Sequence, residues 1–408
     1  MLNQDRNAYF ILFSLWLLVF SASSQVMIIA PLFPLIIVEL DTSESLMGNL
    51  VMVYAIMIGI FAIAMGPVSD KIGRRKILLL GSFLMSIFLF LHSFVESFGH
   101  LLILRALTGG AGGILSGAAV SYVGDYFPYN KRGWANGWVM SGVAMGQILG
   151  IPLGTFLADL YGFKFPFLLF AIIMGLTYLL IFFKVPQPDV EFQNDEITLK
   201  NSLIKYGELL RRKEILSVSI SYLLMFFSLS IYIIYMPVWL TNTFNVSVTE
   251  IGILFLIGGV MNALAGPLAG KISDKTGRKS MILVSCIGLG TLMFFTTILI
   301  KEFWVTYIYF PIAMTFIALR ISPFQALTSE LVRSNNRGSL MSMLVAIGNV
   351  GTGLAGLLSG IFFTMFGFIS NTVLGTVSII ITAFIVWKLV PEPDLKVESI
   401  QKSVELAE

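Results

Sequence analysis

Twelve apolar stretches, each about as long as a membrane-spanning helix, restrict the fold of this chain more than any other feature. They run over residues 9–38, 44–66, 76–97, 99–124, 134–158, 162–184, 215–241, 248–270, 280–300, 303–328, 338–363 and 366–389. A helix of roughly 20 apolar residues crosses the hydrocarbon core of a bilayer, and helices satisfy all their backbone hydrogen bonds internally. A membrane β-barrel would instead show alternating segments of about ten residues. The sequence therefore predicts an all-α integral membrane protein with twelve transmembrane helices.

Composition supports this prediction and excludes other classes of protein. The chain is 57% hydrophobic and 12% charged, with a mean hydropathy of +0.88, whereas soluble domains carry about 25% charged residues. Its basic residues are too scattered for a nucleic-acid surface, and no nucleic-acid motif is present. The lipid bilayer is therefore the expected surrounding, and no nucleic-acid partner is expected.

The distribution of Lys and Arg predicts the orientation in the membrane. With the N-terminus in the cytoplasm, the cytoplasmic loops and the two termini collect 22 of the 26 basic residues. The outer side keeps Lys164 and Lys301, while Arg105 and Arg320 fall within spans. Because cytoplasmic loops are rich in positive charge, we expect a multi-pass protein of the cell membrane with both termini in the cytoplasm.

One long polar stretch divides the chain into two sets of six spans. It begins with "VPQPDVEFQNDE", whose prolines and acids break helices, and continues with "TLKNSLIKYGELLRRK", which predicts a short amphipathic surface helix. The predicted organisation is a six-helix bundle over 1–184, a cytoplasmic linker over 185–213, a second six-helix bundle over 214–390 and a cytoplasmic tail over 391–408.

The two halves share two charged loops. "GPVSDKIGRRK" (66–76) follows the second span and "GKISDKTGRKS" (270–280) follows the eighth, so that Asp70 and Asp274 are 204 residues apart. "DYFPYNKRG" (125–133) and "ELVRSNNRG" (330–338) repeat at an offset of 205. Internal duplication in membrane proteins is typical of transporters that move one repeat against another.

The acids in these loops predict a conformational latch. An acid beside several cations does not help to orient a span, but it can pair with an arginine or a helix N-terminus in one arrangement of the halves. We expect Asp125 to pair with Arg132 and Glu330 with Arg337, which would lock span ends together within each half. We expect Gly73 to allow the sharp turn. The alternative is that these charges only set orientation. The candidate latch residues are Gly66, Asp70, Gly73, Arg74, Arg75, Asp125, Arg132, Asp274, Gly277, Arg278, Glu330 and Arg337.

These loops resemble a known signature. The pattern Gly-x-x-x-Asp-(Arg/Lys)-x-Gly-Arg-(Arg/Lys) of the major facilitator superfamily matches residues 66–75 and again 270–279, and "RALTGG" (105–110) resembles its fourth-span motif. The resemblance covers the whole chain. It implies two pseudo-symmetric six-helix bundles, a solute cavity between them and transport by alternating access, in a protein expected to act as a monomer.

The fifth span suggests a branch of that family. "GWVMSGVAMGQILGIPLGT" (137–155) is rich in glycine and resembles the motif of proton-coupled drug antiporters, with Gln147 where that motif has a proline and with Pro152 later. Small residues at this spacing also let helices approach closely without any role in transport. Both interpretations stay open at this stage.

Polar residues within the spans are the candidates for coupling and substrate binding. An arginine inside the membrane is costly and is by default functional, and the resemblance implies such a role for Arg105. The alternative for Arg105 is a structural pairing with polar neighbours or carbonyl groups. Arg320 precedes Pro323, which predicts a broken helix; its alternative is a side chain that reaches toward the cytoplasm. The full set of candidates is Arg105, Arg320, Gln25, Gln147, Asn262, Gln325, Asn349, Tyr232 and Tyr235.

The sequence thus favours a secondary transporter that exports small amphipathic or drug-like compounds in exchange for protons. The alternative is a carrier for an anionic metabolite, which two intramembrane arginines without embedded acids would suit. No enzyme activity, metal or cofactor is expected, since the two histidines lie near the outer surface and no metal-ligand cluster is present. A coupling proton could bind Asp70, Asp125, Glu39 or His92, although His92 is expected at the membrane interface.

Overall fold

The computed structural model describes residues 2–188, 199–332 and 334–391, and within them the side chains of 2–7, 66, 67, 70, 71, 199–203, 205 and 334–336 lie outside the description. The described residues form helices and no strands, and twelve helical segments are long and apolar enough to cross a membrane. The prediction of an all-α protein with twelve spans is confirmed.

The first half contains six spans, several of them made of two helices. Its elements are α1 (Leu2–Met27), α2 (Phe33–Glu39), η1 (Glu44–Leu46), α3 (Met47–Ile72), α4 (Arg74–Leu91), η2 (His92–Phe94), α5 (Phe98–Leu115), α6 (Ala118–Tyr126), α7 (Tyr129–Met145), η3 (Gly146–Gly150), α8 (Ile151–Tyr161) and α9 (Lys164–Lys184).

The second half follows a short helix of the linker. Its elements are α10 (Leu199–Leu210), α11 (Lys213–Ile233), α12 (Met236–Phe244), α13 (Val248–Thr276), α14 (Arg278–Leu299), α15 (Phe303–Glu330), α16 (Ser334–Phe366) and α17 (Phe368–Leu389). Helix α10 coincides with the predicted amphipathic segment, and residues 189–198 of the linker and 392–408 of the tail lie outside the described residues.

Proline and glycine explain where spans depart from single helices. The first predicted span stops at Met27, and Pro34 starts the separate helix α2. Gly117, with a φ of 74°, separates α5 from α6. In the fifth span, η3 is a π-helical turn just before Pro152, which lacks the N–H that a regular α-helix would need there.

The break predicted at Pro323 is absent. Helix α15 runs without interruption from Phe303 to Glu330 and contains both Pro311 and Pro323. Neighbouring helices can hold a proline-containing helix in place within a membrane bundle, and α15 packs closely against α13 and α14.

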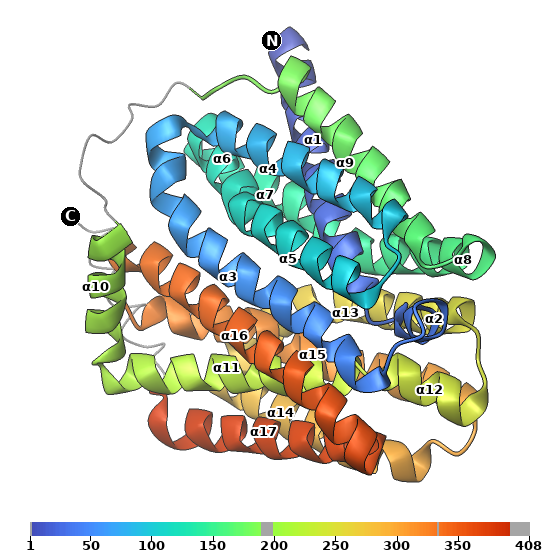
Figure 1. The fold of residues 1–408 in the computed structure, drawn as a ribbon. Coiled ribbons are helices and arrows are strands. Elements are labelled where there is room, and N and C mark those ends of the chain that lie inside the picture. The colour runs from blue at the N-terminus through green and yellow to red at the C-terminus, as the bar shows by residue number, and fades with distance from the viewer. Residues whose placement is uncertain (1, 189–198, 333, 392–408) are drawn as a thin grey trace.

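Figure 1 shows the helices as two bundles, the first half in blue to green and the second in yellow-green to red. Within the first half α3 packs on α5, α4 on α9 and α1 on α7; within the second half α13 packs on α15 and α11 on α16 and α17. The halves meet mainly through two helix pairs, α3 with α16 and α8 with α13.

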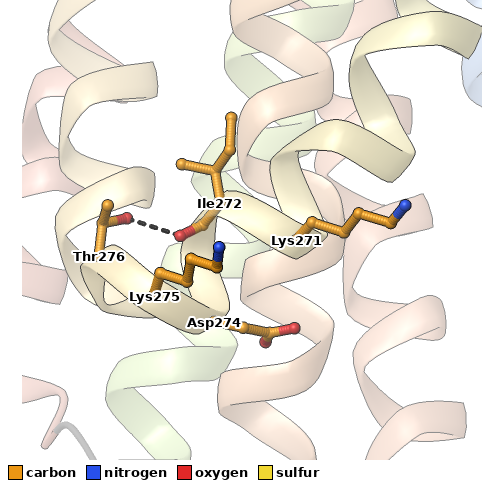
Figure 2. Close-up of a pocket in the computed structure, with 5 residues that line it drawn as sticks. All are labelled: Lys271, Ile272, Asp274, Lys275 and Thr276. Carbon is orange, nitrogen blue, oxygen red and sulfur yellow. Dashed lines mark hydrogen bonds between the residues drawn. The ribbon is translucent and has the colours of Figure 1, made fainter.

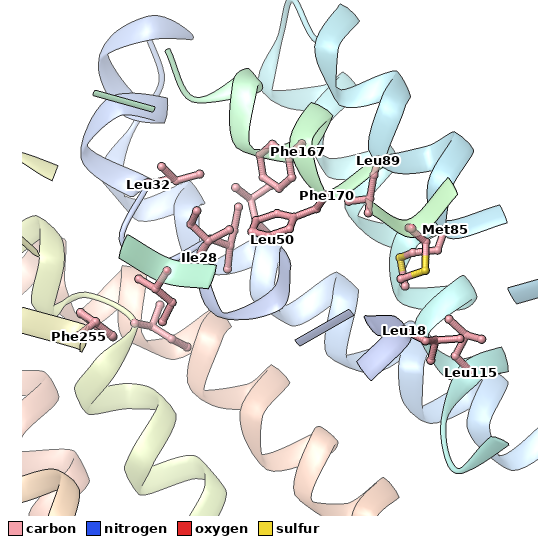
Figure 3. Close-up of a cluster of buried hydrophobic side chains, with 14 of the residues drawn as sticks. Leu18, Ile28, Leu32, Leu50, Met85, Leu89, Leu115, Phe167, Phe170 and Phe255 are labelled. Carbon is pink, nitrogen blue, oxygen red and sulfur yellow. The ribbon is translucent and has the colours of Figure 1, made fainter. Parts of the chain in front are cut away.

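The two faces of the molecule differ in how the halves meet. We call the face with the α3–α4 and α13–α14 turns the basic face, and the other the opposite face. One large cluster of buried apolar side chains contains the first half and the part of the second half near the opposite face, such as Val238 and Phe255; Figure 3 shows Phe255 near Ile28 and Leu32. A separate cluster, with Ile215 and Leu340, fills the second half near the basic face. The apolar core is therefore continuous between the halves only toward the opposite face.

Candidate functional site

The duplicated turn at the basic face has nearly the same backbone in both halves. Gly73 ends α3 with a φ of 96°, and Gly277 ends α13 with a φ of 93°. An L-residue rarely adopts this conformation. A Cβ atom at Gly73 would also lie 2.6 Å from the side chain of Gln187. Glycine at these two positions is therefore required by the backbone.

The first arginine of each turn forms an ion pair within its own half. Arg74 donates from Nε to Asp125 Oδ2 at 2.9 Å and from Nη1 to Ser69 Oγ at 2.8 Å. Arg278 pairs with Glu330 through Nη1 and lies 3.9 Å from Asp274. The arginine of each signature loop thus meets the acid of the second duplicated loop.

The second basic residue of each turn holds the end of a neighbouring span. Arg75 donates to the carbonyl oxygens of Val185 at 2.6 Å and Phe182 at 2.7 Å, at the C-terminal end of α9. Lys279 donates to Val390 O at 2.9 Å, at the end of α17. These cations satisfy terminal carbonyl groups that have no partner within their helix.

The predicted pairs Asp125–Arg132 and Glu330–Arg337 are wrong. Arg132 is exposed, donates to Phe127 O at 3.0 Å and lies over the Tyr129 ring, and Arg337 is exposed. Asp125 does not pair with Arg132 because the six residues between them cross the turn into α7, which leaves Arg132 exposed to solvent. Helix α4 instead places Arg74 beside Asp125 of α6. The side chain of Asp70 lies outside the described residues, as does that of Gly66.

Beside the second turn lies a surface pocket of about 460 Å³, shown in Figure 2. It is lined by Lys271, Ile272, Asp274, Lys275 and Thr276 at the end of α13, and all of these side chains are exposed. The lining comes from one helix end only, so the pocket lies on the surface of the second half.

A buried polar cluster surrounds Arg105 in the first half. Arg105 and Gln25 have no exposed surface and Tyr54 is 4% exposed. Arg105 Nη1 donates to Gln25 Oε1 at 3.0 Å, and Gln25 Nε2 donates to Tyr54 Oη at 2.8 Å. The guanidinium carbon lies 4.3 Å from the centre of the Tyr54 ring, a cation–π geometry that contributes about 2 kcal/mol when desolvated. No acid pairs with Arg105 among the described ion pairs.

Two glycines that follow Arg105 in α5 allow this helix to approach α3 closely, which places Arg105 beside Tyr54. A Cβ atom at Gly109 would lie 2.6 Å from Tyr54 O, and one at Gly113 would lie 2.8 Å from Ile58 O. Because these positions have no side chain, α5 lies directly on α3. The sequence singled out Arg105 and Gln25. The close approach of α3 and α5 adds Tyr54 to these two residues.

Arg320 occupies a different place from Arg105. It is 1% exposed inside the second half, and none of its three side-chain nitrogens has a hydrogen-bond partner. Cys286 of α14 lies near enough to interact with it electrostatically. The alternative in which this side chain reaches toward the cytoplasm is wrong, because α15 turns it into the bundle.

The remaining candidates are distributed over three locations. Gln147 and Asn262 meet across the halves, with Asn262 Nδ2 donating to Gln147 Oε1 at 3.2 Å. Tyr232 is buried inside the second half, where its hydroxyl lies 3.1 Å from Thr296 Oγ1. Gln325 is exposed and Asn349 donates to Val345 O in its own helix. No described hydrogen bond connects the side chains of these last two residues to the other candidates.

Tyr235 joins the halves at the opposite face. Its hydroxyl donates to Glu44 O at 2.7 Å and accepts from Gly48 N at 3.0 Å. Asn242 donates to Glu44 Oε1 at 2.9 Å, and Thr249 donates to Asp159 Oδ2 at 2.7 Å. The partners of Glu44 and Asp159 lie 198 and 90 residues away in the sequence, so no local pattern could have found these contacts.

Comparison with known proteins identifies the family. The family model described as the major facilitator superfamily matches residues 15–288 and, in a second match, residues 218–408. The chain belongs to the major facilitator superfamily. This transporter is therefore a multi-pass membrane protein that moves small molecules, and it is not an enzyme.

Among its relatives, the transporter is 27% identical over 309 residues to the multidrug resistance protein MdtG of Rahnella sp., covering 74% of this chain and 73% of that one. Among solved structures it resembles a bacterial homologue of the human lysosomal transporter Spinster in an inward-facing, unoccupied conformation, with a TM-score of 0.75, 16% identity and coverage of 93% and 95%. It also resembles the nucleoside transporter NupG, with a TM-score of 0.76, 14% identity and coverage of 93% and 99%. At these identities the structures establish the fold alone.

Proposed function

We propose that this transporter exports small amphipathic, drug-like compounds from the cell in exchange for protons, by alternating access. It would do so as a monomer in the cell membrane, with both termini in the cytoplasm. The division into bundles over 1–184 and 214–390, a linker over 185–213 and a tail over 391–408 is part of the same proposal.

One observation supports alternating access: among the described residues, the hydrogen bonds between the halves gather toward the opposite face. Of the five described hydrogen bonds between the halves, four lie at the opposite face, through Tyr235, Asn242 and Thr249, and the fifth, Gln147–Asn262, lies midway along the spans. The described ion pairs at the basic face stay within a half. If the basic face is cytoplasmic, as its positive charge indicates, these described contacts hold the halves together at the outer side.

The duplicated turns fit a mechanism in which each half moves as a rigid body. Arg74–Asp125 and Arg278–Glu330 tie neighbouring spans together inside a half, so each half keeps its shape while the contacts at the opposite face are exchanged for contacts at the basic face. We expected a latch between the halves from Asp70, and we expected Asp125 and Glu330 to lock span ends within each half. In this arrangement Asp125 and Glu330 pair within a half, but with Arg74 and Arg278.

The buried cluster around Arg105 is the proposed binding and coupling site. Its guanidinium is held by a neutral amide and an aromatic ring and is not neutralised by a described acid. A charge that is held without a counter-charge responds strongly to a proton or to a charged group that arrives nearby. Similarity to MdtG, which is named a multidrug resistance protein, favours amphipathic compounds as the cargo.

Transport of ethidium in reconstituted vesicles tests the proposal. With purified protein in liposomes and a pH gradient imposed, we expect ethidium to move against its own gradient, and collapse of the pH gradient to stop the movement. Arg105→Gln should abolish this transport, whereas Glu302→Gln, at an exposed position of the opposite face, should transport as the unmodified chain does. Ethidium movement that ignores the pH gradient would contradict proton exchange.

A second candidate function rests on Arg320. A buried guanidinium without a described hydrogen-bond partner is costly and favours an anion as its ligand. An anionic metabolite is therefore the alternative cargo. Uptake of an organic anion that Arg320→Gln abolishes, together with no movement of ethidium, would favour this candidate over the first.

A further inference from the structure

Gln147 and Asn262 form a pair of amide side chains between the halves. Asn262 of α13 donates from Nδ2 to Gln147 Oε1 at 3.2 Å, and Gln147 belongs to the π-helical turn η3. This is the one described hydrogen bond between the halves that lies away from the opposite face. Both side chains are half-buried, so a molecule between the halves can reach them.

The amide pair lies where the halves begin to separate. On α13, a Cβ atom at Gly259 would lie 2.9 Å from Gln147 Cγ, whereas one at Gly266, about two turns nearer the basic face, would meet nothing within 4 Å. On α3, a Cβ atom at Gly48 would collide with the backbone of α16, whereas one at Gly59, about three turns further on the same side of the helix, would also meet nothing. Open space therefore lies on the basic-face side of the amide pair.

Each amide keeps hydrogen-bonding capacity after this contact. A primary amide has two N–H donors and a carbonyl oxygen, and no other described hydrogen bond involves either side chain. The contact leaves a free N–H on Gln147 and a free carbonyl oxygen on Asn262. If both amides are turned over, these two free groups exchange places and the set stays the same. The pair therefore offers one donor and one acceptor to a third partner.

The surroundings of the amide pair favour an uncharged partner. Residues 133–158 of the fifth span and 251–270 of the eighth span contain no Asp, Glu, Lys, Arg or His. An ionised ligand group would lose its water here without gaining a counter-charge. An amide or urea group, in contrast, has the acceptor and the donor that the pair requires. The position of Gln147 in a π-helical turn is in keeping with a ligand contact, since such turns are frequent at functional sites.

We propose that Gln147 and Asn262 form a binding subsite for an uncharged carboxamide, lactam or urea group of an amphipathic cargo. The carbonyl oxygen of the cargo accepts from Gln147 Nε2 and its N–H donates to Asn262 Oδ1, in place of water. The apolar part of the cargo lies against the uncharged spans. The inference rests on the proposed export and names a substrate class for it, neutral amides, which the cation ethidium does not represent.

The first arm of the test compares two probes that differ in their N–H donors. Para-butylbenzamide has a primary amide, and its N,N-dimethyl derivative keeps the carbonyl group but has no N–H. We expect the purified full chain to bind the primary amide about fivefold more tightly, because one net hydrogen bond separates the two compounds. Partition of each compound into empty detergent micelles is measured and subtracted. A preference below about twofold would overturn the proposal.

The second arm tests whether the preference arises at the amide pair. Gln147→Met combined with Asn262→Leu removes both amides at similar volume, and the preference should fall below about twofold. Each single change leaves one amide and should give an intermediate preference, so the result does not depend on the folding of the double variant. The exchanged pair, Gln147→Asn with Asn262→Gln, should retain the preference. Asn130→Leu, at an exposed position of α7, is the matched control and should keep it in full.

Two results of the second arm would refute the subsite. One is a preference for the primary amide that survives the loss of both side-chain amides. The other is an equal loss of binding for both probes in all variants of the pair, the exchanged one included, since the pair would then only join the halves.

The two probes and ethidium separate this inference from the proposed function. If ethidium is not moved but the primary amide is preferred through Gln147 and Asn262, the export proposal is wrong and the subsite stands. If ethidium is exported with a pH gradient and the chain shows no preference between the two probes, the export proposal stands and the subsite falls.

Discussion

Arg105 shows how a single charge is made tolerable inside the membrane. Its guanidinium donates to Gln25 and lies on the face of Tyr54, so its partners are a neutral amide and a ring. This arrangement keeps the positive charge unneutralised. A site of this kind depends on the shape of the side chain as well as on its charge.

At the same scale, Arg105→Lys and Tyr54→Phe should separate charge from geometry. Lysine keeps the charge but cannot both donate to Gln25 and lie flat on the ring, so we expect a loss of about tenfold or more in ethidium transport. Tyr54→Phe removes only the hydroxyl that accepts from Gln25, which contributes about 1 kcal/mol, or about fivefold. Transport in vesicles measures both, with Tyr129→Phe at an exposed position as the control. Full activity of Arg105→Lys would contradict the geometric role.

The ion pairs of the basic face make a second residue-scale prediction. Asp125→Asn removes the charge from the partner of Arg74, and Glu330→Gln does the same for Arg278. Both side chains are partly buried, so we expect each change to cost about 1 to 3 kcal/mol of stability and to lower the transition temperature in detergent. Asp274→Asn, 65% exposed and 3.9 Å from Arg278, should change the transition temperature much less. Equal losses for all three variants would show that the pairs do not brace the halves.

Among the elements, α3 and α16 form the closest approach between the halves. A Cβ atom at Gly48 would lie 1.8 Å from Gly356 O, and one at Gly360 would lie 2.3 Å from Ser45 O. Backbone atoms meet here without side chains between them. The closed opposite face therefore depends on glycine at the ends of these two helices.

Gly48→Ala should consequently weaken closure of the opposite face. We expect the balance to move toward the arrangement that is open on that side, and transport to slow because one half of the cycle is disfavoured. Labelling of a cysteine at Thr249, in a Cys286→Ser background, by a membrane-impermeant maleimide should become faster. Gly266→Ala is the matched control, since a Cβ atom there meets nothing within 4 Å. Unchanged labelling of Gly48→Ala would rule out this role for the glycine pair.

For the whole molecule, the central prediction is that the two halves must separate at the opposite face during transport. Glu44 and Asn242 contact each other across the halves with 2.9 Å between Oε1 and Nδ2. Cysteines at these two positions, again with Cys286→Ser, should be joined by a short bis-methanethiosulfonate crosslinker, which should stop transport by holding the opposite face closed. Reduction should restore transport, and the crosslinker should not affect transport by a protein that carries either cysteine alone. Undisturbed transport through a fully crosslinked protein would argue against alternating access.

The sequence by itself determined the number of spans, the duplication and the family, because these depend on hydrophobic length, on charge near the membrane and on local motifs. Those signals lie within about 20 consecutive residues and need no knowledge of neighbours. The same locality explains why Gly73 was identified correctly as a turn residue, and the repeat places Gly277 at the matching position.

Only the tertiary structure decided which groups meet. Asp125 pairs with Arg74, 51 residues away, and not with Arg132 in the same loop, because helix packing brings α4 beside α6. His92 was expected at the membrane interface but is buried, because it is covered by α9, a helix that begins some 70 residues later. The contacts between the halves at the opposite face likewise join distant parts of the chain. Burial and pairing are set by how the spans pack, and a run of apolar residues does not specify which of its sides will face a particular neighbour.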